Sequence, residues 1–208
     1  MSGPLEQLLR HPALWRGGGG GDAPATVATG FRRLDERLPG HGWPLATLVE
    51  LLVPSPGVGE LRLLIPALRA LSVARPDAPR WIAWLAPPHL PYAPALADAG
   101  LEPSRTLVVR PRAGLDVLWA MEQALRSGAC TAVLGWTGAA GDQALRRLVL
   151  AAGEGQSLGF LFRPACYRHE SSPAALRLLL TARDNGLDIE ILKSRGGMPA
   201  RVDGLLIH

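Results

Sequence analysis

The chain has 208 residues, of which 48% are hydrophobic, and its formal net charge is +4. This length suits one α/β domain with a short extension, and no stretch approaches the roughly 18 consecutive apolar residues of a membrane span. The N-terminus lacks a secretory pattern and Cys130 and Cys166 stand alone, so we expect a cytoplasmic protein with reduced thiols and no membrane contact.

The first 28 residues are set apart by composition. Residues 1–16 carry apolar side chains at roughly helical spacing: Leu5, Leu8, Leu9, Leu14 and Trp15. Five glycines open a linker over residues 17–28, so the core domain is predicted over residues 29–208. The N-terminal segment is either a loosely docked end or a partner-binding peptide, and both interpretations stay open.

Residues 48–64, L-V-E-L-L-V-P-S-P-G-V-G-E-L-R-L-L, organise the core. An apolar strand, a turn and a helix follow one another, which is the layout of a phosphate-binding loop. The loop and its flanks would be formed by Pro54, Gly57, Gly59, Glu60 and Leu61. Glu60 stands where the motif has Lys and Leu61 where it has Ser or Thr, so we expect a vestigial loop that holds no nucleotide.

Strand and helix patterns alternate through the rest of the chain. Strands are predicted at residues 45–53, 81–86, 106–110, 131–136 and 158–162, with helices between them, and two last strands form a C-terminal β-hairpin. This order predicts an α/β fold whose central sheet is mostly parallel and flanked by helices. In such sheets ligands bind at the carboxyl ends of the strands.

The pattern resembles the core of the RecA-like recombinases. The segment T-G-F-R-R-L-D-E-R-L-P-G-H-G-W-P leads into the loop as it does in that family. The resemblance implies that Pro88 replaces the catalytic Glu, Trp136 the magnesium-associated Asp, and Arg163 the γ-phosphate-sensing Gln. We therefore expect a pseudo-ATPase without catalytic residues or a nucleotide cofactor, and the scattered histidines predict no metal site.

Seven segments support a finer match. They are G-H-G-W-P (40–44), G-E-L-R-L-L (59–64), P-Y-A-P-A-L-A-D-A-G-L (91–101), L-W-A-M-E-Q-A-L-R-S-G (118–128), R-R-L-V-L-A-A (146–152), S-S-P-A-A-L-R-L (171–178) and I-L-K-S-R-G-G (191–197). Together they are similar to the ImuA family, RecA-like accessory proteins of SOS-induced mutagenesis. This resemblance implies a scaffold for error-prone translesion DNA synthesis, with ImuB (a Y-family polymerase relative), an error-prone DnaE-type polymerase and RecA as partners, and association with the nucleoid on induction.

Several basic residues are candidates for contact with single-stranded DNA. They are Arg146, Arg147, Arg163, Arg168, Lys193 and Arg195. Basic side chains beside an aromatic one can contact phosphates and stack on a base. Solvated surface positions are the simpler explanation of the same residues.

Two other functions fit the pattern. One is a divergent RecA-like ATPase that uses displaced residues. The other is an SOS cell-division inhibitor of the SulA type, because those proteins share a related degenerate fold, and inhibition of FtsZ polymerisation would identify it.

Overall fold

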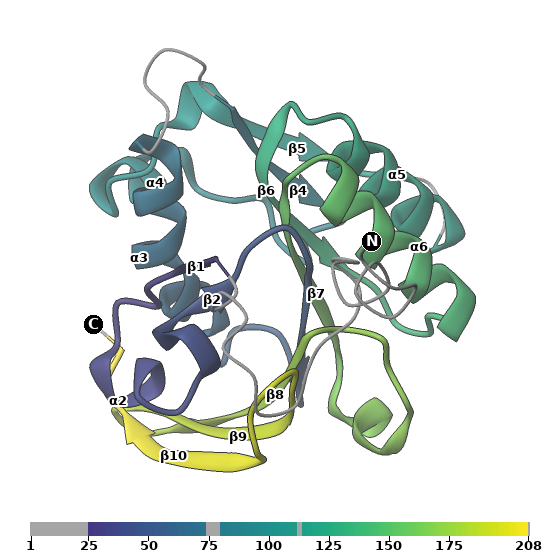
Figure 1. Ribbon diagram of the computed structural model, residues 1–208. Coiled ribbons are helices and arrows are strands. Elements are labelled where there is room, and N and C mark those ends of the chain that lie inside the picture. The colour runs from purple at the N-terminus through teal and green to yellow at the C-terminus, as the bar shows by residue number, and fades with distance from the viewer. Residues whose placement is uncertain (1–24, 74–79, 112–113, 208) are drawn as a thin grey trace, which may run out of the picture.

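The computed structural model describes residues 25–73, 80–111 and 114–207 (Figure 1). Its main sheet is formed by β3 (Leu48–Val53), β4 (Trp81–Leu85), β5 (Thr106–Val109), β6 (Cys130–Trp136), β7 (Leu158–Pro164), β8 (Leu176–Arg183), β9 (Gly186–Ser194) and β10 (Ala200–Leu205). The eight strands lie in the order β10-β9-β8-β3-β7-β6-β4-β5. A separate two-stranded sheet pairs β1 (Thr26–Val27) with β2 (Trp43–Pro44).

Helices cover both faces of the main sheet. They are α2 (Arg32–Asp35), α3 (Glu60–Val73), α4 (Ala93–Asp98), α5 (Gly114–Arg126) and α6 (Asp142–Glu154), with short 3-10 turns η1 (Pro39–His41), η2 (Pro103–Arg105) and η3 (Ala165–His169). One apolar core joins α3 to one face, and a second joins α5 and α6 to the other (Figure 1). The predicted fold class, a mostly parallel sheet between helices, is confirmed.

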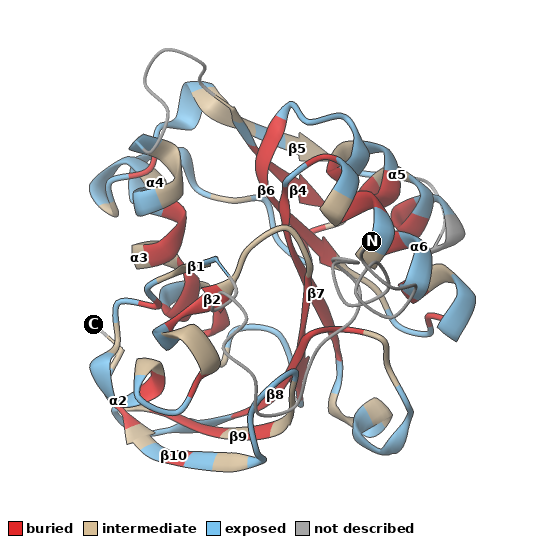
Figure 2. Cartoon of the chain, viewed as in Figure 1, coloured by how far each residue is buried: buried red, intermediate tan, exposed pale blue. Residues whose placement is uncertain are grey.

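The central strands are buried on both faces. All six residues of β3 are buried, as are six of the seven residues in β6 and in β7 (Figure 2). Continuous apolar runs are typical of parallel strands enclosed by helices. Strands β3 to β8 run parallel, so their carboxyl ends all lie on the same side of the molecule.

The C-terminal hairpin is confirmed, but the strand before it escaped the sequence analysis. β9 and β10 pair antiparallel, and β8 joins them to β3. The run L-R-L-L-L forms the first five residues of β8, all of them buried, and Arg177 is the one charged residue in this run. The strand tolerates this charge because Glu50 on β3 lies directly across from Arg177.

The predicted linker extends too far. Thr26 and Val27, within the predicted residues 17–28, form β1 and pair with Pro44 and Trp43 of β2. Strand pairing of these residues is fixed by Trp43, which is fully buried and packs its ring edge-on against Phe160 at 5.4 Å. The N-terminal segment 1–16 and the rest of that linker, up to residue 24, lie outside the described residues.

Candidate functional site

The loop after β3 binds a carboxylate of its own chain. Glu60, the first residue of α3, is 4% exposed. Its Oε1 accepts a hydrogen bond from the Gly57 N–H at 3.0 Å, and its Oε2 accepts one from the Gly59 N–H at 3.1 Å. Backbone N–H groups in such a loop are the donors that would hold a phosphate. Here the side chain of Glu60 takes them.

The C-terminal segment packs against the same loop. Gly59 has a φ of +103°, and a Cβ placed on it would collide with Cδ1 of Ile207 and lie 3.9 Å from Cδ2 of Leu187. Leu61 is partly buried against the core, whereas Pro54 is exposed. Of the five residues of the predicted vestigial loop, Gly59, Glu60 and Leu61 thus pack against the rest of the chain, whereas Pro54 and Gly57 are exposed.

Aromatic side chains occupy the neighbouring strand ends. Trp84 on β4 stacks on Trp136 of β6 at 5.7 Å between ring centroids, and Trp136 stacks on Phe162 of β7 at 4.5 Å. The stack spans three adjacent strands on the side of the sheet that α3 covers. Trp136 thus brings apolar surface where the RecA-like pattern has a magnesium-associated Asp. Pro88, three residues after β4, is exposed.

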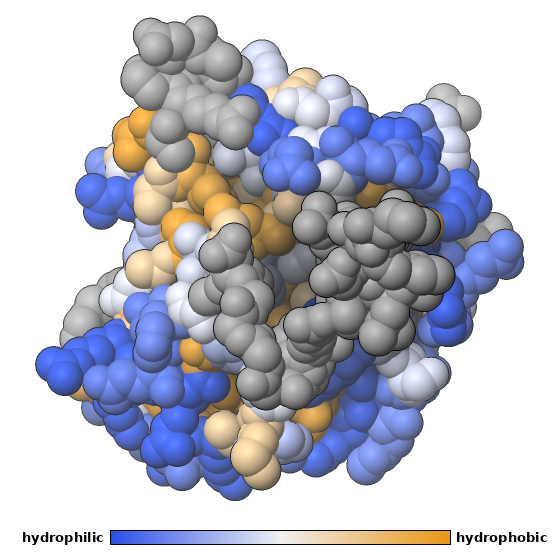
Figure 3. Space-filling view, in the orientation of Figure 1, coloured by the Kyte–Doolittle hydropathy of each residue, from blue (hydrophilic) through white to orange (hydrophobic). Residues whose placement is uncertain are grey.

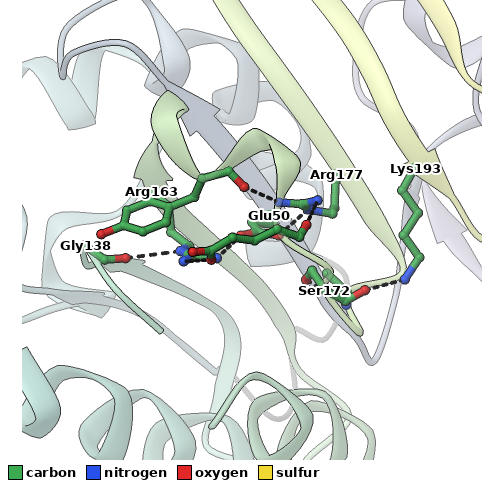
Figure 4. A network of polar contacts seen from close by, with 9 residues as sticks. Glu50, Gly138, Arg163, Ser172, Arg177 and Lys193 are labelled. Atoms are coloured by element: carbon green, nitrogen blue, oxygen red, sulfur yellow. Dashed lines mark hydrogen bonds and ion pairs between the residues drawn. The ribbon is translucent and has the colours of Figure 1, made fainter. Parts of the chain in front are cut away.

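A buried ion network lies on the opposite face (Figure 4). Arg177 of β8 lies directly across from Glu50 of β3, and Arg163 of β7 lies two residues beyond Leu161, which pairs with Glu50 on the other side. Its Oε1 lies 2.7 Å from Nη1 of Arg163, and its Oε2 lies 2.5 Å from Nε of Arg177. The side chains of Glu50 and Arg163 have no exposed surface, so each charge depends on the other for compensation.

The two guanidinium groups also hold the connection between β7 and β8. Arg163 donates to the Gly138 carbonyl at 3.1 Å and to the Glu170 carboxylate at 2.8 Å, and stacks over the Tyr167 ring at 4.2 Å. Arg177 donates to the carbonyls of Glu170 and Tyr167 at 2.6 and 3.0 Å. The prediction that Arg163 contacts nucleic acid is therefore wrong, because its charge is buried and used inside the molecule.

The two candidate arginines of α6 are paired with acidic residues. Arg146 binds Asp142 one turn earlier at 2.7 Å, and Arg147 binds Glu122 of α5. Both arginine side chains are more than half exposed, as the helical pattern predicted. Arg147 therefore contributes to the contact between the two helices.

The remaining basic candidates lie on η3 and near the end of β9. Arg168 pairs loosely with Glu190 at 3.3 Å, and Arg195 is exposed. Lys193 donates to the Ser172 carbonyl at 2.6 Å, and burial, with nearby guanidinium groups, lowers the pKa of its ammonium. Contact with nucleic acid at the five candidates other than Arg163 stays a prediction.

A cavity of about 220 Å³ opens at the amino ends of the parallel strands, opposite the carboxyl ends described above. Leu45, Leu71 and Leu158 line it, together with Ala25 and Thr131. Figure 3 shows apolar side chains gathered on the face beside α3 and α4. This cavity lies away from the strand ends at which the sequence predicted a site.

The comparison with protein families decides the assignment. The family described as "Cell division inhibitor SulA" matches residues 48–159, which begin with β3 and end at the start of β7. That stretch is more than half of the chain. The chain belongs to the SulA family. The match contains the loop 54–59, α3, both helices of the second core, and Trp84 and Trp136 of the aromatic stack.

The chain is also similar in sequence to individual SulA proteins. The chain is 32% identical over 116 residues to cell division inhibitor SulA of Photorhabdus laumondii, covering 56% of this chain and 63% of that protein. It is 35% identical over 102 residues to SulA of Edwardsiella piscicida, covering 49% of this chain and 58% of that protein. The chain thus spans about three fifths of the length of these relatives.

A solved structure is also similar in sequence. SulA from Pseudomonas aeruginosa is 32% identical, and the match covers 56% of this chain and 97% of that one, with a TM-score of 0.46. At that TM-score the superposition carries no argument about the fold.

The assignment to the ImuA family was wrong. The family match and these relatives are all SulA, which also removes the translesion, mutagenesis and DNA repair roles and the protein partners that came with them: ImuB, an error-prone polymerase and RecA. The quoted segments misled because several of them serve the fold. Gly128 ends α5 with a φ of +68°, and Glu60 caps the loop before α3. Residues that serve a shared backbone in this way do not separate related families.

The described residues hold no helix that is long and apolar enough to cross a membrane.

Proposed function

We propose that the chain is a non-enzymatic inhibitor of cell division that is produced in the SOS response. It acts in the cytoplasm by binding FtsZ and preventing its polymerisation. The family match over residues 48–159 carries this proposal, because the curated relatives are cell division inhibitors. The cell-division alternative from the sequence thereby takes the place of the translesion scaffold.

The absence of catalysis is part of the proposal. Three features of the strand ends support it: the Glu60 carboxylate on the loop amides, the aromatic stack through Trp136, and the use of Arg163 by Glu50. Hydrolysis of a nucleoside triphosphate needs a positioned metal, a base and positive charge at the phosphates. A carboxylate at the loop supplies the opposite charge.

The same features support a RecA-like origin for the fold. A strand, a glycine turn and a helix follow one another from β3 to α3, as in a phosphate-binding loop. In this proposal the loop is a remnant that the fold retains for packing, since Gly59 lies against Ile207 and Glu60 caps the turn.

The deciding experiment measures FtsZ assembly by light scattering after addition of GTP. We expect the purified chain to suppress assembly at concentrations near that of FtsZ, and its expression in a rod-shaped bacterium to cause filamentation. Unchanged assembly together with normal division would overturn the proposal.

A parallel assay tests the divergent-ATPase alternative. We expect no ATP hydrolysis above a heat-denatured control and no shift in melting temperature with Mg·ATP. Hydrolysis that disappears in Gly59→Ala would support the enzyme instead.

A further inference from the structure

The two edge strands of the main sheet, β10 and β5, differ in how they are protected against pairing with a further strand. At one end, β10 has protection typical of an edge strand. The Arg33 guanidinium of α2 donates to the carbonyls of Asp203 and Gly204 at 2.8 and 3.2 Å, and the pairing with β9 shifts register between Val202 and Leu205. These features hinder the addition of another strand at β10.

The other edge strand, β5, is only four residues long and lacks the register shift and the covering arginine found at β10. Its sequence T-L-V-V contains no charge and no proline, and it pairs with β4 without a register shift (Figure 1). Leu107 is 46% exposed at this edge. An exposed apolar edge is a hazard for aggregation, and the same exposure makes it suited to binding.

The backbone of β5 presents hydrogen-bonding groups outward. The Val109 carbonyl accepts a hydrogen bond from the Ala86 N–H at 2.8 Å, so the backbone groups of Val109 face β4. Successive residues of a strand direct these groups to opposite sides, which turns the N–H and C=O of Val108 toward the open edge. The Thr106 N–H points to the same side but already donates a hydrogen bond to the Pro103 carbonyl. Val108 therefore offers the pair of groups that an added strand would use.

Charges at the two ends of β5 argue against a second copy of the chain. Arg105 precedes the strand and the exposed Arg110 follows it. An antiparallel pair of β5 strands in which all four residues are matched would place Arg105 of each copy opposite Arg110 of the other. Arg105 is balanced by Glu102 at 2.9 Å, whereas no ion pair of Arg110 is found among the described residues. Arg110 thus favours an acidic residue on a different protein.

We propose that the β5 edge binds the division protein by strand addition. The partner contributes an extended apolar segment, and an acidic residue of that segment lies beside Arg110. This inference rests on the proposed function and specifies its contact surface. The edge lies within residues 48–159, the stretch that matches the SulA family.

Two variants test this surface with FtsZ as the probe. Val108→Pro removes the outward N–H and leaves the hydrogen bonds to β4 in place, a position at which an edge strand tolerates proline. We expect it to weaken FtsZ binding about tenfold or more. Arg110→Glu reverses the charge beside the edge and should weaken binding roughly 3- to 10-fold. Arg146→Glu makes the same charge change on α6 and should stay within about twofold of the wild type.

The outcomes separate this inference from the proposed function. A wild-type chain that does not bind FtsZ or inhibit its assembly overturns the proposed function and, with it, this surface. A wild-type chain that inhibits, together with folded edge variants that bind equally well, overturns the surface alone. Hydrogen exchange of the wild-type complex is the readout if Val108→Pro fails to fold. We expect at least a tenfold slower exchange of the Val108 amide on binding, and unchanged exchange would contradict strand addition.

Discussion

Glu50 and Arg163 form a fully buried ion pair of 2.7 Å across two adjacent strands, although 113 positions separate them in the chain. Arg177 binds the other oxygen of the same carboxylate. The Glu50 carboxylate thus compensates the charges of both guanidinium groups. Glu170, whose side chain is half exposed, provides a second carboxylate to Arg163. This arrangement fixes the segment between β7 and β8 against β3.

We expect Glu50→Gln to destabilise the protein by about 3–5 kcal/mol, because it leaves two buried guanidinium groups without their carboxylate. Urea unfolding at pH 7, followed by far-UV circular dichroism, measures the change. Glu190→Gln is the matched control, since the Glu190–Arg168 pair is partly exposed at 3.3 Å and should contribute less than about 1 kcal/mol. Equal losses in the two variants would contradict a structural role for the buried network.

Glu60→Gln tests the carboxylate on the loop. An amide can accept a hydrogen bond from only one of the two backbone donors and directs its own N–H toward the other. We expect a loss of roughly 1.5–3 kcal/mol in unfolding free energy. Glu36→Gln changes an exposed pair with Arg32 in the same way and should cost less than about 1 kcal/mol. A Glu60→Gln protein as stable as the wild type would show that the two loop contacts contribute nothing.

Gly59→Ala tests the packing of the C-terminal segment on the loop. Gly57 and Gly59 both have a φ near the left-handed region, so alanine at either position should cost about 1–2 kcal/mol from backbone strain. A Cβ at Gly57 meets nothing within 4 Å, whereas one at Gly59 collides with Ile207. We therefore expect Gly59→Ala to lose about 1 kcal/mol more than Gly57→Ala.

A double mutant separates the collision from the strain. Combining Gly59→Ala with Ile207→Ala should be less destabilising than the sum of the two changes by roughly 0.5 kcal/mol or more in thermal unfolding. Strict additivity would place Ile207 away from the loop in solution.

Stability should depend on pH through Glu122. Burial raises the pKa of this carboxyl, but hydrogen bonds and charges from Arg147 and Arg126 together lower it below its ordinary value of 4.5. A lowered carboxyl pKa stabilises the folded state above the ordinary value, and this stabilisation disappears as the pH falls through the lowered one.

We expect Glu122→Gln to lose about 1–2 kcal/mol at pH 7, and the difference from the wild type to shrink as the pH falls below about 4.5. Urea unfolding at a series of pH values measures it. Glu154→Gln, which removes the exposed partner of Arg126, should change stability by less than about 1 kcal/mol. A difference that stays constant down to pH 3 would assign the loss to packing.

The alternation of apolar strands with amphipathic helices was sufficient to predict the sheet, its flanking helices and the C-terminal hairpin. Those elements follow from local periodicity, which the side chains of each segment carry independently. The strand β8 was missed because Arg177 interrupts its apolar run. The family was misjudged because segments required by a shared backbone were taken as specific to one family.

By itself, the sequence determined the class of fold and showed that Glu60 and Leu61, rather than Lys and Ser or Thr, follow the glycine turn, since both depend on residue types at fixed local spacing. Only the tertiary structure decided what the amides of that turn bind. It placed the Glu60 carboxylate on the Gly57 and Gly59 amides, and it turned Arg163 from a candidate for DNA contact into the partner of Glu50. The physical reason is that a charge becomes a buried ion pair or an exposed site according to which groups the folded chain brings within its reach, and these can lie far away in the sequence.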